Sequence, residues 1–364
     1  MQQSLINRII HIVDTLLPVN FGIWNAAISP SETLWNLYNI KSECWYPADK
    51  RNGNLPVGIK GIELQSLRLE GLNQILQIEK PDSDNTLIIT HGVWNYPTRW
   101  GNYLAKRGYR WWYVPHGMLE PWSMQQKWLK KQVYFNLIEK NLVKKAEVIR
   151  AVGKPEQNNL TKLFGREIVL IPNGIEADSA IREKSFALPR KYVFISRLHH
   201  KKGILPLVEA WYSSNLSDNK DFELIIAGPD DGELSKIQHL LSHHPNGNVN
   251  YAGAVYGAEK KKLLEASHFF LLPSQSEGFP TSIPEAMQYG LIPFFSEGCN
   301  FPEAFEAGVA IKTGIEVNEI RESLESSLKY DEKSLIIWSK KISQFVREKY
   351  SLPVIAGLIK ERIV

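Results

Sequence analysis

The stretch "PSQSEGFPTSIPEAMQYG" (273–290) follows the apolar run "HFFLLPS" (268–274). The run predicts a buried strand, because it is short, continuous and rich in aromatic and branched side chains. "EGFP" (277–280) predicts a turn, and "TSIPEAMQYG" (281–290) predicts a helix that ends at its glycine. A strand, a turn and a helix in this order are the repeating unit of a parallel α/β sheet.

Two carboxylates, Glu277 and Glu285, stand eight positions apart in this stretch. Glu277 is expected in the turn and Glu285 about one turn into the helix, with Thr281 or Ser282 as the helix cap. A carboxylate accepts two hydrogen bonds at a fixed spacing, which suits the vicinal hydroxyls of a sugar or a ribose. The alternative is that Glu277 only caps the helix and Glu285 is a solvated acid.

Strand-like runs alternate with amphipathic, helix-length runs along most of the chain. The predicted strands lie at 8–16, 86–93, 110–117, 167–174, 191–198, 222–229, 248–255, 268–274 and 291–296, and one long helix is predicted over 123–146. The polar segment 173–191 interrupts this alternation and predicts a linker. The pattern predicts an α/β fold of two doubly wound, Rossmann-like domains that face each other across a cleft.

We expect an N-terminal domain over 1–178 and a C-terminal domain over 179–345, with a last helix at about 346–364 that packs back on the first domain. The chain has 364 residues, of which 43% are apolar and 23% charged, as in soluble globular proteins. Its two cysteines cannot form a disulfide framework, and no run reaches the roughly 20 apolar residues of a membrane span. Asp14 interrupts the first apolar run, which argues against a signal peptide, so a cytoplasmic location is predicted.

Charge and tryptophan are concentrated in the first half. Residues 1–178 carry 21 Lys and Arg against 16 Asp and Glu, and nine of the eleven tryptophans, whereas the remainder carries 22 against 23. Attraction to anionic lipid headgroups, with tryptophan at the interface, would explain this composition. A solvated basic face with buried indoles explains it equally well.

Two further segments predict contacts with phosphate. "SRLHHKKG" (196–203) places Arg197 and Lys202 in a turn between a strand and a helix, where two cations suit a diphosphate. Gly22 in "PVNFGIW" (18–24) would let the backbone approach a phosphate closely. A solvated basic turn and a plain turn are the respective alternatives.

Several ordered motifs together resemble a known family. They are "PNGI" (172–175), "SRL…KKG" (196–203), "IAGPDD" (226–231), "YAGAV" (251–255), "LLPSQSEGFPTSIPEAMQYGLIPF" (271–294), "ITHGVW" (89–94) and "VPHGMLEPWS" (114–123). This order is similar to that of the retaining glycosyltransferases of family 4, which share the GT-B fold and an E-x7-E motif. The first half resembles the acceptor domains of members that build bacterial surface polysaccharides.

The resemblance implies a role for each matching residue. Arg197 and Lys202 match the basic pair that holds the donor's diphosphate. Glu285 matches the glutamate that binds the nucleotide ribose, and Glu277 the one that faces the donor sugar. His116 matches a histidine that faces this sugar from the other domain.

The donor-binding set implied by the resemblance also includes main-chain groups. Backbone near Val255 would contact the base, and the backbone of Gly278, Phe279, Thr281 and Ser282 would contact the sugar and the phosphate. The family's usual glycine-glycine loop is "NFG" here, which weakens the assignment of Gly22. Pro284 replaces a common aliphatic residue before Glu285, which is compatible with a helix start.

The implied reaction moves a sugar from a nucleoside-diphosphate sugar to a saccharide or lipid-linked saccharide, with retention, in exopolysaccharide, O-antigen or capsule synthesis. The predicted place is the cytoplasm or the inner face of the plasma membrane, with peripheral binding to anionic lipid as the open question. No nucleic acid or cofactor is expected. No metal is expected either, because "DSD" (82–84), Asp230 and Asp231 are interpreted as solvated turns.

Other classes of protein share some of these features. A nicotinamide oxidoreductase would carry G-x-G-x-x-G after a strand, which this sequence lacks. A non-catalytic GT-B scaffold and a sugar-nucleotide epimerase of the same fold remain as alternatives.

Overall fold

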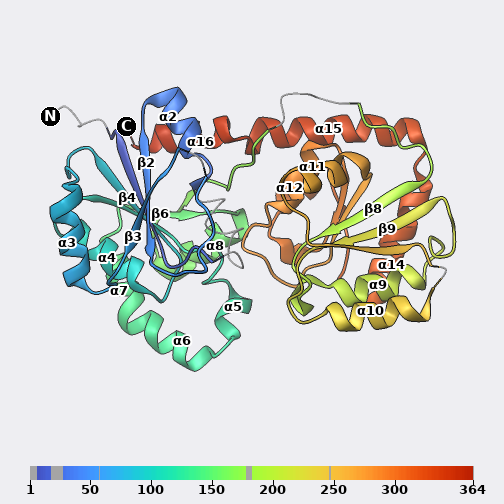
Figure 1. Cartoon of the computed structure of the whole chain (residues 1–364), viewed down its shortest axis with the longest axis horizontal. Coiled ribbons are helices and arrows are strands. Elements are labelled where there is room, and N and C mark those ends of the chain that lie inside the picture. The colour runs from blue at the N-terminus through green and yellow to red at the C-terminus, as the bar shows by residue number, and fades with distance from the viewer. Residues whose placement is uncertain (1–5, 18–27, 57, 178–182, 246, 364) are drawn as a thin grey trace. The chain divides into compact units, whose positions relative to one another are not determined.

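The computed structural model describes residues 6–17, 28–56, 58–177, 183–245 and 247–363 (Figure 1). The chain divides into two compact units. Unit 1 comprises Met1–Glu176 and Tyr350–Val364, and unit 2 comprises Ala177–Lys349. Both are Rossmann-like α/β units.

Unit 1 contains a seven-stranded sheet of order β3-β2-β1-β4-β5-β6-β7, in which all paired neighbours are parallel. Its strands are β1 (Arg8–Val13), β2 (Lys41–Pro47), β3 (Lys60–Leu64), β4 (Thr86–His91), β5 (Arg110–Val114), β6 (Val148–Ala151) and β7 (Val169–Leu170). The central β4 is buried along all six residues, as expected for a parallel strand covered on both faces. The strand order reverses between β1 and β4, which makes the edge above these two strands the switch point of the sheet.

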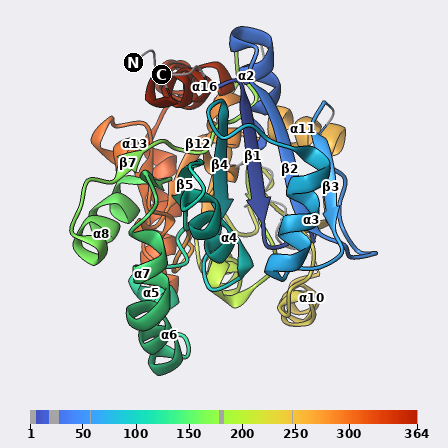
Figure 2. The same cartoon turned by 90° about the vertical axis from the view of Figure 1, so that its left-hand side faces the viewer.

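The helices of unit 1 follow its strands, and the last of them comes from the end of the chain. They are α2 (Ser31–Tyr38), α3 (Leu69–Glu79), α4 (Tyr96–Ala105), α5 (Pro121–Gln125), α6 (Trp128–Tyr134), the π-helix η2 (Phe135–Glu139), α7 (Lys140–Val143), α8 (Lys154–Phe164) and α16 (Leu352–Ile363). Helix α16 packs beside α2 (Figure 2). It is fixed there by backbone hydrogen bonds between Ile175 and the residues around Ser351.

Unit 2 contains a six-stranded parallel sheet of order β10-β9-β8-β11-β12-β13. Its strands are β8 (Arg190–Ile195), β9 (Phe222–Ala227), β10 (Val249–Gly253), β11 (Phe269–Leu272), β12 (Ile292–Phe295) and β13 (Ile311–Lys312). Its helices are η3 (His200–Lys202), α9 (Ile204–Tyr212), α10 (Leu234–His243), α11 (Gly257–Ala266), α12 (Ser282–Gln288), η4 (Glu297–Cys299), α13 (Pro302–Glu306), α14 (Val317–Ser326), η5 (Ser327–Lys329) and α15 (Glu332–Tyr350). The switch point of this sheet lies between β8 and β11.

The predicted α/β class is confirmed, and several predicted elements need correction. The long helix predicted over 123–146 is wrong as a single element, because Gln126 is extended and Lys127 has a φ of 54°. A π-helical turn then follows α6. The strand predicted over 167–174 is only two residues long, and β2, β3, β6 and β13 were not predicted.

Helix α4 packs closely on β5, because Gly101 leaves room for the fully buried indole of Trp111. A Cβ atom at Gly101 would overlap this ring. Gly357 of α16 has room for a side chain. The nearest atom to a Cβ atom at this position is the Tyr38 hydroxyl oxygen, at 3.6 Å.

These two glycines give a matched pair of substitutions. Gly101→Ala is expected to lower the free energy of unfolding by about 1–3 kcal/mol through overpacking. Gly357→Ala is expected to raise it by up to about 1 kcal/mol, because alanine has the higher helix propensity. Urea denaturation followed by tryptophan fluorescence measures both, and equal effects at the two positions would contradict the packing described for Trp111.

Candidate functional site

An ion pair crosses the switch point of unit 2. Lys202 lies in η3 after β8, and Glu277 lies in the turn after β11. The Lys202 Nζ lies 2.6 Å and 2.8 Å from the two carboxylate oxygens of Glu277. The Ser274 hydroxyl donates a third hydrogen bond to this carboxylate, at 2.6 Å. Both charged side chains are nearly buried, with 13% and 10% of their surface exposed.

The turns around this pair hold one another through the backbone. The Gln275 N–H donates to the Lys201 carbonyl at 2.8 Å, and the Glu277 N–H donates to the Gly298 carbonyl at 2.7 Å. Gly203 follows Lys202 with a φ of 71°, and a Cβ there would overlap the Pro273 carbonyl. A residue with a side chain would therefore push these two turns apart.

Arg197 stands in the same turn as Lys202, and its partner is a different carboxylate. Its Nη1 lies 2.7 Å from Oδ2 of Asp231, and both side chains are partly exposed. The neighbouring Asp230 accepts hydrogen bonds from the backbone N–H groups of Gly232 and Leu234, at 2.9 and 3.1 Å. These donors lower the pKa of Asp230. Both aspartates were expected in a solvated turn. In the structure Asp231 is the ion-pair partner of Arg197, and Asp230 caps backbone N–H groups.

Glu285 is the fourth residue of α12 and forms an ion pair with Lys260 of α11. The predicted side-chain cap of this helix is wrong. Thr281 occupies the cap position in a helical conformation, and its side chain makes no capping hydrogen bond. Glu277 and Glu285 therefore bind different lysines, one in the turn after β8 and one on a neighbouring helix.

The other predicted donor-binding residues follow the carboxyl ends of the strands of unit 2. Val255 lies two residues beyond β10 and is half-buried. The ring of Phe279 packs edge-on against Phe301, with 5.3 Å between ring centroids. Gly278, Thr281 and Ser282 lie in the turn before α12 or at its start, and Gly22 lies outside the described residues.

His116 lies in unit 1, after β5, in a left-handed backbone conformation with a φ of 54°. It is buried, and its Nε2 is 2.9 Å from Nδ1 of His91 at the end of β4. The Nε2 of His91 is 2.9 Å from Nδ1 of His11 on β1. Sequence reasoning missed His11 and His91. These two lie in the neighbouring strands β1 and β4, and His116 follows β5, the next strand of the sheet.

The three imidazoles are held neutral. Burial lowers the pKa of His11 and of His116 to about 3, and the positive charge of Arg150 acts in the same direction. Burial also lowers the pKa of His91, with further contributions from His116, His11 and Arg150. Arg150 lies on β6 and donates to the carbonyls of residues 171 and 172, at 2.8 and 2.9 Å.

Glu156 of α8 holds the turn that contains His116. One carboxylate oxygen accepts from the Gly117 N–H at 2.5 Å, and the other accepts from the Val152 N–H at 2.8 Å. Burial raises the pKa of Glu156 to about 7. The turn after β5 is therefore fixed to α8 by a carboxyl group that is buried within unit 1.

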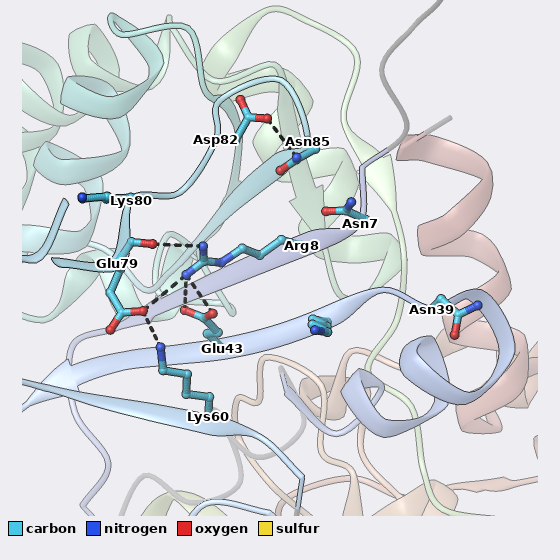
Figure 3. A pocket seen from close by; sticks show the side chains of 10 residues that line it. Asn7, Arg8, Asn39, Glu43, Lys60, Glu79, Lys80, Asp82 and Asn85 are labelled. Carbon is cyan, nitrogen blue, oxygen red and sulfur yellow. Dashed lines mark hydrogen bonds and ion pairs between the residues drawn. The ribbon is translucent and has the colours of Figure 1, made fainter. Parts of the chain in front are cut away.

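A pocket of about 560 Å³ opens at the opposite, amino end of the unit 1 sheet (Figure 3). Four of its charged side chains form ion pairs with one another. Arg8 pairs with Glu43 at 2.8 Å and with Glu79 at 3.6 Å, and Lys60 also pairs with Glu79. Ligands of doubly wound sheets bind at the carboxyl ends of the strands. This pocket is therefore separate from the histidine row and from the ion pair described above.

Within the ranges that the structure describes, no three His, Cys, Asp or Glu side chains are grouped so that they could hold a metal ion. No helix in those ranges is both long enough and apolar enough to span a bilayer. The prediction that no metal is needed stays a prediction.

Comparison with known proteins identifies relatives of this chain. Residues 178–341 match the family model described as glycosyl transferases group 1. The chain is 32% identical over 160 residues to TuaC of Bacillus subtilis (strain 168), whose name assigns it to teichuronic acid biosynthesis as a glycosyltransferase. This match covers 41% of the chain and 38% of TuaC.

Solved structures match nearly the whole chain. Anabaena HepE, solved in complex with UDP and glucose, matches with a TM-score of 0.71 at 16% identity, over 98% of this chain and 99% of HepE. The lipopolysaccharide outer core galactosyltransferase WaaB matches with a TM-score of 0.68 at 16% identity, over the same shares. At these identities the likeness shows the fold, which is the predicted GT-B fold of two Rossmann-like domains.

The low pKa of the histidine row has a measurable consequence. Between pH 8 and pH 5, the rings of His11, His91 and His116 are expected to stay neutral, whereas a histidine with the ordinary pKa of about 6.5 would become protonated. The unfolded chain takes up these protons below about pH 6.5, so the row costs stability as the pH falls. The raised pKa of Glu156 adds stability as the pH falls, because the folded chain binds this proton first. The loss from three histidines is larger than the gain from one carboxyl group. NMR titration of the imidazole resonances tests this, and a midpoint near 6.5 for any of the three would contradict it.

Proposed function

We propose that the chain transfers a sugar from a nucleoside-diphosphate sugar to an acceptor, with retention of configuration, because residues 178–341 match the family model of the group 1 glycosyl transferases. The observation that carries the proposal is the Lys202–Glu277 ion pair at the switch point between β8 and β11. Doubly wound sheets bind nucleotides at this position.

The ion pair leaves donor capacity for a phosphate. A lysine ammonium carries three N–H donors, and the two contacts to Glu277 account for two of them. Arg197 carries five N–H donors and uses its Nη1 toward Asp231. Both cations can therefore bind the diphosphate while their carboxylate partners hold them in place.

Charge development explains why these cations would matter for the rate. As the glycosidic bond breaks, negative charge grows on the departing diphosphate and positive charge grows on the sugar ring. Preorganised cations stabilise the first charge more in the transition state than in the ground state. We assign this role to Lys202 and Arg197, and we assign the contact with the sugar ring and its hydroxyls to Glu277.

The remaining donor contacts are proposed from the same strand ends. Glu285 would bind the ribose, backbone near Val255 would contact the base, and the turn from Gly278 to Ser282 would contact the sugar and the phosphate. His116 would contact the donor sugar from unit 1. Neither glutamate is left over as a nucleophile, so attack on the same face as the departing group is preferred over double displacement. HepE, a structural neighbour, was solved with UDP and glucose, which supports a nucleotide-sugar donor.

The acceptor is proposed to be a lipid-linked saccharide at an anionic membrane surface, in the synthesis of a surface polysaccharide. Helices α6 and η2 extend away from the sheet of unit 1 (Figure 2). They expose large apolar side chains, at 40–69% of their surface: Trp128, Leu129, Val133, Leu137 and Ile138. Exposed lysines lie among and beyond them: Lys127, Lys130, Lys144 and Lys145.

Apolar and cationic side chains in one helical segment fit a helix that lies in the lipid interface. Lys131, which the sequence also suggested as a lipid contact, is engaged within the protein. Its Nζ donates to the Ser123 carbonyl at 2.6 Å and lies 5.8 Å from the centre of the Trp94 ring. The names of TuaC and WaaB, which refer to teichuronic acid and lipopolysaccharide, agree with an acceptor of the cell surface.

Lys202→Ala tests the donor site. The substitution removes a cation that stabilises the leaving diphosphate, so kcat is expected to fall by about two orders of magnitude or more. Lys191→Ala is the matched control, because it removes a lysine of an ion pair at the amino end of the same sheet. Nucleotide release from a panel of nucleotide sugars, with acceptor extracts, measures both variants. Equal turnover of the Lys202→Ala variant and the wild type would overturn the phosphate assignment.

The same assay separates the alternatives. Release of nucleotide with transfer to an acceptor is expected in excess chelator, and its loss there, restored by magnesium, would show a metal site. Conversion of the donor into an epimer would favour the epimerase. Absence of both reactions with every donor would favour a scaffold.

Vesicle co-sedimentation tests the membrane proposal. The chain is expected to bind anionic vesicles more strongly than neutral ones, and to release them as salt rises. Lys127→Glu/Lys130→Glu is expected to weaken binding by about tenfold or more, since each lysine near such a surface contributes about 1 kcal/mol. Lys162→Glu, on an exposed position of α8, is the control. Equal binding to both vesicle types would make a soluble acceptor the better proposal.

A further inference from the structure

The three buried histidines of unit 1 form a continuous row across β1, β4 and the turn after β5. Val13 pairs with His91, so His11, two positions before Val13 on β1, lies on the same side of the sheet as His91. His116 follows β5 in a left-handed turn, and its ring meets His91 from there. Neighbouring rings are 5.2 Å apart between centroids, with planes 21° and 27° apart. Each neighbouring pair of rings shares one N···N contact of 2.9 Å.

The number of hydrogens in the row leaves two possible arrangements. Each N···N contact needs one hydrogen, and three neutral imidazoles carry three. Two hydrogens therefore lie within the contacts. The third lies at one end of the row, either on Nε2 of His11 or on Nδ1 of His116, and every ring changes tautomer when the third hydrogen changes end.

The two ends of the row differ in their surroundings. Among the described residues, Nε2 of His11 is buried and has no hydrogen-bond partner. An N–H group at this position would be a buried donor without a partner, and buried N–H groups without a partner are rarer in proteins than acceptors that lack one. The opposite end is Nδ1 of His116, the ring nitrogen that His91 does not contact.

We infer that His11 and His91 are positioning residues, which fix His116 as a neutral imidazole with its hydrogen on Nδ1 and so present an N–H donor to a hydroxyl oxygen of the donor sugar. The assignment of the sugar to this nitrogen rests on the proposed function. The hydrogen itself is assigned from the row alone. His11 determines the direction of every hydrogen bond in the row, although it does not touch His116.

The surrounding groups keep this arrangement in place. The charged group that acts on all three rings is Arg150 of β6, which is itself held by backbone carbonyls. Glu156 of α8 binds the Gly117 N–H and so holds the turn that carries His116. A left-handed conformation at a residue with a side chain costs about 1 kcal/mol or more, and it persists only where neighbours hold it. The ring of His116 is thus fixed in position as well as in tautomer.

Nitrogen-15 NMR of the histidine-labelled chain, without ligand, reads the tautomer of each ring directly. The expected result at pH 8 is a protonated Nδ1 and an unprotonated Nε2 for His116. A protonated Nε2 on His116, or an even mixture, would overturn the inference. This readout does not depend on catalysis.

Two nearly isosteric substitutions at the far end of the row test the coupling. His11→Asp places a carboxylate that only accepts, so His91 must donate from Nε2 and accept at Nδ1. His116 is then expected to carry its hydrogen on Nε2. His11→Asn supplies an amide N–H at the position of Nδ1 and is expected to keep the hydrogen of His116 on Nδ1. The same tautomer in both variants would overturn the inference.

Kinetics of the same variants connect the row to the reaction. The His11→Asp variant is expected to lose about tenfold in kcat/KM, the value of one hydrogen bond, and the His11→Asn variant to recover most of this loss. His243→Gln, on an exposed histidine of α10, is the control for loss of a histidine. A changed tautomer with unchanged kinetics would overturn the contact with the sugar. If the wild-type chain transfers no sugar, the proposed function fails, whereas the tautomer of His116 still decides the inference about the row.

Should a charge at position 11 prevent folding, His91→Phe breaks both contacts without introducing one. His116 is then expected to lose its fixed tautomer and to show hydrogen on both nitrogens. A His116 that keeps its hydrogen on Nδ1 alone in this variant would overturn the role of His91.

Discussion

The reversal of strand order between the first and fourth strands of each sheet is the constraint on which the rest of the structure depends. All strands within a sheet are parallel, so the turns that follow them emerge at one edge. At the reversal, the helices that follow two neighbouring strands diverge, and the turns there have room for ligands and for one another. The Lys202–Glu277 pair occupies this position in unit 2, and the contact between His11 and His91 occupies it in unit 1.

The two units use this position in opposite electrostatic ways. Unit 2 brings cations there and holds each with a carboxylate: Lys202 with Glu277, and Arg197 with Asp231. A charge held in this way needs little rearrangement when a phosphate binds, which is the requirement for preorganised stabilisation. Unit 1 instead places neutral, hydrogen-bonded rings near a buried guanidinium. One unit is suited to stabilising charge, and the other to presenting a polar group of fixed direction.

Much of this fold could be predicted from the sequence, because buried parallel strands are continuous apolar runs. The predicted strands of the second half were found with slightly shorter bounds, and the turns with Arg197, Lys202 and Glu277 were placed correctly after β8 and β11. Strands β2 and β3 were missed because charged residues inside them, Glu43 and Glu63, interrupt their apolar pattern. The break in 123–146 was missed because neither Gln126 nor Lys127 is a typical helix breaker, and only the backbone shows the left-handed Lys127. The histidine row could not be predicted from spacing, since its members are 80 and 25 positions apart and meet only through strand order.

The return of the chain end to unit 1 has a consequence for synthesis on the ribosome. Helix α16 buries Ile355, Ala356 and Ile359, and the backbone around Ser351 pairs with Ile175. The guanidinium of Arg110, at the start of β5, donates to the carbonyl of Ile363 at 2.7 Å. Domains usually fold in the order in which they leave the ribosome. Here unit 1 lacks α16 until residues 350–364 have emerged, whereas unit 2 already has all of its segments at residue 349. A nascent chain can therefore complete unit 2 before unit 1.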